Sequence, residues 1–174
     1  MNAIYFILDS LLALALYVAL LRPLMQWSRA DFRNPLAQAV VRLTNPLIIP
    51  LRRVLPPVGR IDTASVVTVV LVALVKTGVL YLLQNFMPPA VIWLRGTLLE
   101  ILRATLWLYF YAIFLYALLG LIAPGAYSPM QSLLTSLCEP VLRPVRRLIP
   151  LIAGLDLSPL FVGLAIQAIL IVLH

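Results

Sequence analysis

Long runs of apolar residues alternate along this chain with segments that hold most of its prolines and arginines. Four of the runs are long enough, or nearly so, to cross a hydrocarbon core of roughly 30 Å as a helix that rises about 1.5 Å per residue. Two of them begin at an aspartate, whose carboxylate accepts hydrogen bonds from the free N–H groups of a helix start. We therefore predict four transmembrane helices, at residues 4–21, 62–83, 98–123 and 156–173.

The segment that follows the first apolar run is repeated after the third. Residues 45–56, NPLIIPLRRVLP, return at residues 139–150 as EPVLRPVRRLIP, with a constant offset of 94 residues. Because proline fixes φ and removes a hydrogen-bond donor, prolines in register indicate a repeated backbone path. The repeated positions are Pro46, Pro50, Arg52, Arg53, Pro56 and Asp62 in the first copy and Pro140, Pro144, Arg146, Arg147, Pro150 and Asp156 in the second. The sequence predicts an internal duplication, with repeats at 1–94 and 95–174.

Each repeat also contains an amphipathic segment, at residues 34–57 and 128–150. Asn34 and Ser128 are each followed by proline, which is a helix-start signal. One helical face then carries apolar residues, at Leu36, Val40, Leu43 and Leu47 in the first copy and Met130, Leu134, Leu137 and Val141 in the second. This pattern is typical of a helix in the membrane interface. The later prolines should kink or break each helix before the aspartate, and the paired arginines should reach lipid phosphates, helix-end carbonyls or a carboxylate.

Composition agrees with a membrane environment, since 63% of the residues are hydrophobic and only 11% are charged. A soluble domain of 174 residues has too little interior for so many apolar side chains. Each repeat contributes two crossings, so both copies enter the membrane from the same side and form parallel repeats. The predicted fold class is an all-α membrane protein with four transmembrane helices in two parallel repeats, each with an interfacial Pro/Arg-rich segment.

The distribution of arginine predicts the orientation. Seven arginines, at positions 22–60, lie in the first predicted loop and three, at 143–147, in the third, whereas the middle loop contains only Arg95. By the positive-inside tendency, loops one and three are cytoplasmic and both termini lie outside the cytoplasm. The net charge of +7 then points to anionic lipid head groups as partners, and the sequence lacks the aromatic-interleaved basic surface of a nucleic-acid-binding protein.

The doubled proline–arginine–aspartate signature, the four predicted crossings and the length resemble the YggT family of small bacterial membrane proteins, which has relatives in cyanobacteria and chloroplasts. The resemblance covers nearly the whole chain. It implies a place in the bacterial inner membrane and a link to osmotic or potassium-related stress tolerance, to division and nucleoid distribution, or, in plastids, to assembly of a cytochrome complex. The second copy departs from the first by having Glu139 in place of Asn45.

Polar residues inside the apolar runs form a second candidate site. At about 1.5 Å per residue they fall at similar depths, which predicts one intramembrane polar layer of Asp9, Lys76, Glu100, Arg103 and Gln167. The offset of 94 residues places Asp9 and Arg103 at equivalent positions, so we expect them to pair. The layer is either a neutral network that fixes helix register or an ion or proton site.

The sequence favours no enzymatic function. It contains one cysteine, Cys138, and one histidine, His174, and neither a phosphate-binding glycine loop nor a nucleophile elbow, so we expect no catalytic residues, metal site or cofactor. The predicted role is a scaffold or assembly factor that presents its amphipathic segments to a membrane or cytoplasmic protein partner, with a homo-oligomer left open. The alternative is a transport component or a regulator of potassium, proton or osmolyte flux.

Overall fold

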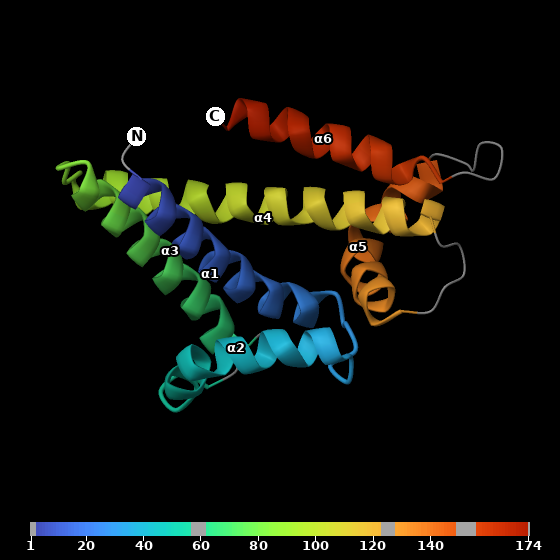
Figure 1. The fold of residues 1–174 in the computed structure, drawn as a ribbon, viewed down its shortest axis with the longest axis horizontal. Coiled ribbons are helices and arrows are strands. Elements are labelled where there is room, and N and C mark those ends of the chain that lie inside the picture. The colour runs from blue at the N-terminus through green and yellow to red at the C-terminus, as the bar shows by residue number, and fades with distance from the viewer. Residues whose placement is uncertain (1–2, 57–61, 123–127, 149–155, 174) are drawn as a thin grey trace. The chain divides into compact units, whose positions relative to one another are not determined.

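The computed structural model describes residues 3–56, 62–122, 128–148 and 156–173, and the regular secondary structure of these residues is all helical. The helices are α1 (Ala3–Trp27), α2 (Pro35–Arg52), α3 (Thr63–Leu83), α4 (Ala90–Ile122), α5 (Pro129–Leu148) and α6 (Ser158–Val172) (Figure 1). The predicted all-α class is thus confirmed for these residues. Pro150 of the repeated motif, and the predicted segment ends at residues 57, 123 and 150, lie outside them.

Among the described residues, three helices are long and apolar enough to cross a membrane. These are α1 with 25 residues, α3 with 21 and α4 with 33. Helix α6 is also apolar, but its 15 residues span about 22 Å at 1.5 Å per residue, less than the roughly 30 Å of a hydrocarbon core. The chain is a membrane protein on this evidence, and the fourth crossing stays a prediction.

Helix α4 begins earlier than the sequence analysis placed it, at Ala90 and not near residue 98. Proline suits the start of a helix because the first N–H groups have no partner within it, and the N–H of Trp93 donates to the carbonyl of Pro89 at 3.0 Å. Arg95, assigned to a loop from the sequence, therefore lies within α4. Arg22 was likewise assigned to a loop and lies within α1.

Helices α2 and α5 continue through prolines. Pro46 and Pro50 are inside α2, and Pro140 and Pro144 are inside α5. A spacing of four residues places both prolines of each pair along one edge of the helix, so the missing N–H groups fall on the same edge. The sequence predicts a kink or break before Asp62. Helix α2 continues through both of its prolines and ends at Arg52, before Asp62.

The chain divides into two compact units. Unit 1 comprises Met1–Pro23 and Val40–Thr105, and unit 2 comprises Leu24–Ala39 and Leu106–His174. The buried interior of unit 1 includes Leu16, Ala19, Leu20, Ile48, Ala64, Val69 and Ala73. In unit 2, α5 packs against α6, and the buried residues include Ile113, Leu134, Leu137, Cys138, Leu142, Val162 and Ile166. Large apolar side chains on the helices that contain these residues are otherwise extensively exposed, as expected when lipid is the solvent.

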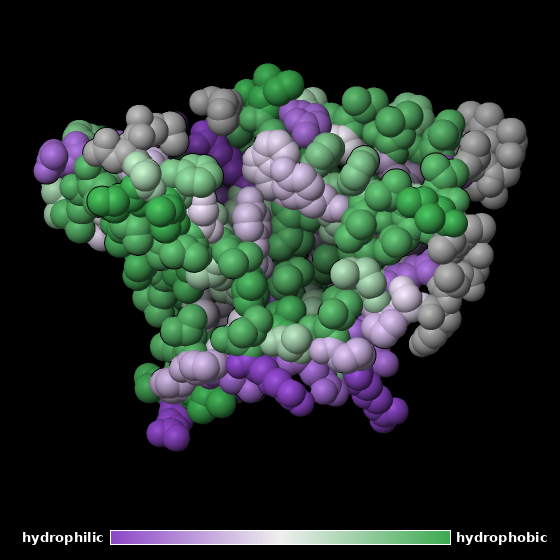
Figure 2. Space-filling model, in the orientation of Figure 1, coloured by the Kyte–Doolittle hydropathy of each residue, from purple (hydrophilic) through white to green (hydrophobic). Residues whose placement is uncertain are grey.

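The apolar face predicted for α2 is divided between protein and surroundings. Val40 is buried together with Ala37, Thr44 and Ile48, whereas Leu43 is 66% and Leu47 is 52% exposed. The helix also has a hydrophilic face: Figure 2 shows hydrophilic side chains along α2 at the lower edge of the view. Helix α2 thus has a buried face, an exposed apolar face and a hydrophilic face, and its place in the membrane interface stays a prediction.

Candidate functional site

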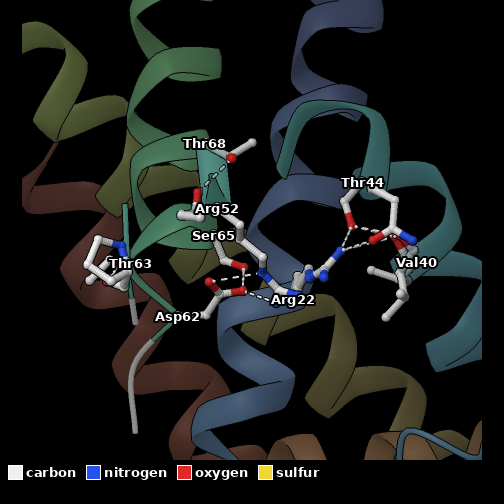
Figure 3. A network of polar contacts seen from close by, with 12 residues as sticks. Arg22, Val40, Thr44, Arg52, Asp62, Thr63, Ser65 and Thr68 are labelled. Carbon is white, nitrogen blue, oxygen red and sulfur yellow. Dashed lines mark hydrogen bonds and ion pairs between the residues drawn. The ribbon is translucent and has the colours of Figure 1, made fainter. Parts of the chain in front are cut away.

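The repeated arginine and aspartate of the first copy form an ion pair in unit 1. Nη2 of Arg52 lies 2.5 Å from Oδ2 of Asp62, and Ser65 Oγ donates to the same oxygen at 2.6 Å (Figure 3). The Asp62 side chain is only 10% exposed. Because Arg52 is the last residue of α2 and Asp62 directly precedes α3, the pair ties the end of one helix to the start of the next.

A second arginine lies beside this pair, and the sequence analysis gave it no role. Arg22 of α1 is 4% exposed, and its Nη1 donates to Thr44 Oγ1 at 2.8 Å and to Asn45 Oδ1 at 2.9 Å (Figure 3). Both acceptors belong to α2. The bonds from Nη1 offset part of the cost of burying the guanidinium, and they hold α1 against α2. The signal available in the sequence was an arginine directly before Pro23 at the end of an apolar run.

The second copy of the motif forms a larger cluster in unit 2. Arg146 Nε lies 2.7 Å from Asp156 Oδ2, Nη1 lies 2.8 Å from Glu139 Oε2, and Nη2 donates to the Tyr116 hydroxyl at 2.8 Å. The guanidinium carbon is also 5.8 Å from the centre of the Tyr116 ring, within reach of a cation–π contact. The Arg146 guanidinium of α5 thus contacts Tyr116 of α4 and Asp156, which lies just before α6.

Hydrogen bonds and charge set the protonation of this cluster. Burial by itself would raise the pKa of Asp156, but hydrogen bonding by Ser158 and the Arg146 guanidinium outweigh it, so the pKa lies below its ordinary value. Burial likewise opposes the charge of Arg146, whereas its bonds to Asp156 and Tyr116 raise the pKa above the ordinary range. Asp156 is therefore ionised and Arg146 charged throughout the physiological range.

The two clusters occupy equivalent positions but carry opposite net charge. The offset of 94 residues relates Arg52 to Arg146 and Asp62 to Asp156, and it also relates Arg22 to Tyr116 and Asn45 to Glu139. Unit 1 therefore holds two guanidinium groups with one carboxylate, and unit 2 holds one guanidinium with two carboxylates. Identity between the two copies indicates the shared pair, whereas the charge is set by the two positions at which the copies differ.

The remaining motif residues lie mostly on the surface. Arg53 and Arg147 are exposed beside their paired neighbours, as are Pro46, Pro50, Pro56 and Pro144, whereas Pro140 is half-buried. The duplicated arginines therefore have different environments. Arg52 and Arg146 have carboxylate partners within the protein, and Arg53 and Arg147 face outward.

Three of the five residues of the predicted polar layer meet in unit 1. Lys76 of α3 is 9% exposed in its side chain, and its Nζ lies 3.2 Å from Asp9 Oδ1 of α1 and in hydrogen-bond contact with Glu100 Oε1 of α4. One ammonium thus joins three helices. The expected pairing of Asp9 with Arg103 stays a prediction. Gln167 lies on α6 in unit 2, where it lines a groove.

A hydrogen-bonded chain that the sequence did not indicate lies next to Lys76. Trp93 Nε1 donates to Thr77 Oγ1 at 2.9 Å, and the hydroxyls of Thr77 and Thr97 are 2.9 Å apart. The Trp93 ring also packs over Gly78, where an added Cβ would lie 2.8 Å from the ring carbon Cζ2. Polar pairing and close approach therefore hold α3 against α4 beside the charged group.

Comparison with known proteins identifies the family. The CCB3/YggT family matches residues 1–83 and 96–174. The chain belongs to this family. YggT of Escherichia coli K12 is 39% identical over 169 residues, which cover 97% of this chain and 88% of the relative. A protein from Pseudomonas aeruginosa is 40% identical over 173 residues, which cover 97% of this chain and 86% of the relative. A protein from Haemophilus influenzae is 31% identical over 155 residues, which cover 89% and 82%. No solved structure matches the chain.

Proposed function

We propose that this CCB3/YggT protein is a non-enzymatic scaffold or assembly factor of the bacterial inner membrane, which presents α2 and α5 at the cytoplasmic face. The observation that carries the proposal is the equivalent ion pair in each unit, Arg52 with Asp62 and Arg146 with Asp156. Each pair fixes the end of an interfacial helix to the start of the apolar helix that follows. The pairs give the two helices a defined orientation, which a docking surface needs.

The outward faces of these helices support a contact with lipid and with a protein partner. Leu43 and Leu47 leave an apolar strip on α2, and Arg53 and Arg147 present cationic groups beyond the ion pairs. Exposed guanidinium groups near an interface attract anionic head groups by about 1 kcal/mol each. An apolar strip beside them fits a membrane surface or the apolar face of a partner helix.

The proposed orientation rests on charge. With Arg22 and Arg95 placed in helices, the connection between α3 and α4, residues 84–89, contains no basic residue, whereas residues 28–53 contain five arginines. Positive-inside asymmetry then favours a cytoplasmic α2 and α5 with both termini outside the cytoplasm. In sealed cells, an impermeant thiol reagent should modify Asn2→Cys and Pro89→Cys but not Gln38→Cys or Ser132→Cys. Modification of Gln38→Cys from outside would reverse the orientation.

A second candidate function is a transport component or regulator of potassium, proton or osmolyte flux. The observation that favours it is the group formed by Asp9, Lys76 and Glu100 on three helices, because charged side chains in apolar helices are costly and often mark an ion path. The likeness of the chain to a family linked with osmotic stress points the same way.

Two sets of variants separate the functions. The double variant Arg53→Gln/Arg147→Gln alters the presented surface, and Asp9→Asn/Lys76→Met/Glu100→Gln neutralises the intramembrane group. Photocrosslinkers at Leu43 and Leu47 should give defined adducts in intact cells that the first variant loses and the second keeps. Potassium and proton fluxes into liposomes should equal those of empty liposomes. A flux that the wild-type protein produces and the second variant abolishes would overturn the scaffold proposal in favour of transport.

A further inference from the structure

Unit 2 contains an apolar groove that shares only Asp156 with the ion pairs described above. It has a volume of about 410 Å³, within the usual range of roughly 300–1,000 Å³ for small-molecule sites. Its walls come from α4, with Phe110, Ile113, Phe114 and Ala117, and from α6, with Pro159, Leu160, Gly163 and Leu164. These residues recur at three- and four-residue intervals, so each helix contributes one continuous apolar face.

The groove has polar residues among this apolar lining. Asp156 lies where α5 gives way to α6, and Gln167 lies eight residues beyond Pro159, about 12 Å along the helix at 1.5 Å per residue. The apolar lining therefore extends along α6 from a carboxylate at the helix start. A ligand that fits needs an extended apolar portion with a cationic group at one end.

The cluster at the Asp156 end of the groove has one more carboxylate than guanidinium groups, so its net charge is negative. Arg146 is the shared cation of Asp156 and Glu139, and its three nitrogens are occupied by these two acids and by Tyr116. The corresponding cluster of unit 1 has no such surplus, because Asn45 stands where unit 2 has Glu139. The negative charge thus arises from a residue specific to the copy that also contains the groove.

We propose that this groove binds the acyl chain of a phosphatidylethanolamine molecule, whose primary ammonium pairs with the carboxylates of Asp156 and Glu139. A primary ammonium carries three hydrogen-bond donors, and the two carboxylates keep acceptor sites beyond those used by Arg146 and by the Ser158 N–H. A quaternary choline group has no N–H donor, and a phosphatidylglycerol head group has hydroxyl donors but no cation to pair with the carboxylates. The phosphate of the bound lipid lies on the side of α5 where Arg143 and Arg147 are exposed.

Native mass spectrometry with matched lipids tests the proposal. The delipidated full-length protein in detergent is mixed with equal amounts of phosphatidylethanolamine, phosphatidylcholine and phosphatidylglycerol that share the same acyl chains. We expect the ethanolamine lipid to be retained about fivefold over the choline lipid, the ratio given by roughly 1 kcal/mol for a half-exposed ion pair. Equal retention of the ethanolamine and choline lipids, or preference for phosphatidylglycerol, would overturn the proposal.

Glu139→Gln tests the head-group contact without removing the Arg146–Asp156 pair. Glu139 does not line the groove but shares Arg146 with Asp156, so Glu139→Gln should bring the ratio of ethanolamine to choline lipid close to one. Asp31→Asn removes the same charge at an exposed position that belongs neither to the groove lining nor to the Arg146 cluster, and it should leave the ratio unchanged. A preference that persists in Glu139→Gln places the ammonium elsewhere and rejects the site.

Gly163 tests the acyl-chain contact. An added Cβ at Gly163 would lie 3.9 Å from Phe110 Cε2, an ordinary contact, so Gly163→Ala should bind lipid as the wild type does. The longer side chain of Gly163→Leu should fill the groove and abolish the ethanolamine preference. If Gly163→Leu keeps that preference at a wild-type thermal midpoint, the lipid is bound outside the groove and the assignment is wrong.

Discussion

Arg146 Nε lies 2.7 Å from Asp156 Oδ2, and the residues 94 positions earlier, Arg52 and Asp62, form the same ion pair. Two copies of a motif with different surroundings thus keep one contact, which links α2 to the start of α3 and α5 to the start of α6. The guanidinium nitrogens differ, Nη2 in Arg52 and Nε in Arg146, but the recurrence of the pair indicates a structural role in both units. Their difference in charge lies in the residues around it.

The Arg146–Asp156 contact should contribute measurable stability. Asp156→Asn removes the charge of a half-exposed pair, so we expect a loss of about 1 kcal/mol in the free energy of unfolding. A cycle with Arg146→Gln should show coupling between the two positions in thermal or denaturant unfolding in detergent. Additive losses from the single variants would exclude a stabilising pair.

The same contact predicts a response to acid. The pKa of Asp156 is lower in the folded protein than its ordinary value of about 4, so the carboxylate adds stability above that value and loses it as the pH falls through the folded-state pKa. The difference in thermal midpoint between wild type and Asp156→Asn should therefore shrink below about pH 4. A difference that is constant from pH 7 to pH 3 would contradict the assignment.

Lys76 should be more sensitive to change than either of its acidic partners. Lys76→Met leaves Asp9 and Glu100 without the cation that joins them, whereas Lys76→Arg keeps the charge. Loss of one partner from a buried pair costs about 3–5 kcal/mol in soluble proteins, and less is expected in a membrane. Neutralising all three residues should recover much of the stability that Lys76→Met loses.

A second mutant cycle tests the pairing of Asp9 with Arg103 that the repeat predicts. Asp9→Asn and Arg103→Gln, alone and combined, report whether those two residues are coupled. Unfolding in detergent is the measurement for both cycles. If the triple neutral variant is no more stable than Lys76→Met, the charged group does not act as a unit.

Cys138 should be unreactive while the protein is folded. The residue is fully buried, and burial raises the pKa of its thiol to about 12 although the Arg146 charge opposes the shift. A maleimide should therefore modify Cys138 only when the protein unfolds, so the rate of modification should rise as the protein is heated through its unfolding transition. In a Cys138→Ser background, Thr135→Cys on the exposed side of the same helix should react at once. Rapid modification of native Cys138 would contradict its burial.

The contact between α3 and α4 should not tolerate a side chain at Gly78. An alanine Cβ would lie 2.8 Å from the Trp93 ring, and overpacking of this kind costs about 1–3 kcal/mol. Gly120 of α4 is the matched control, because an added Cβ there meets no atom within 4 Å. Thermal unfolding should show Gly78→Ala destabilised and Gly120→Ala unchanged or slightly stabilised. Equal midpoints would contradict the close approach.

Much of this protein is determined locally and was predictable from the sequence. Apolar runs must become helices in lipid, because only helices satisfy their own backbone within the segment, and proline after Asn34 or Ser128 starts a helix wherever the chain lies. The doubled motif also identified Arg52, Asp62, Arg146 and Asp156 as residues that matter, although it left their partners open.

Only the tertiary structure decided which of the possible partners each residue takes. From the sequence, Arg52 and Arg53 are adjacent and chemically identical, yet the fold directs one to Asp62 and the other outward. The sequence predicts Arg22 in a loop. In the structure it lies in α1, and Thr44 and Asn45 of α2 accept hydrogen bonds from its buried guanidinium. Asp9 has an ion pair with Lys76 of another helix, which the repeat offset did not indicate, because contacts between helices depend on their rotation and distance, and no spacing along one helix specifies these.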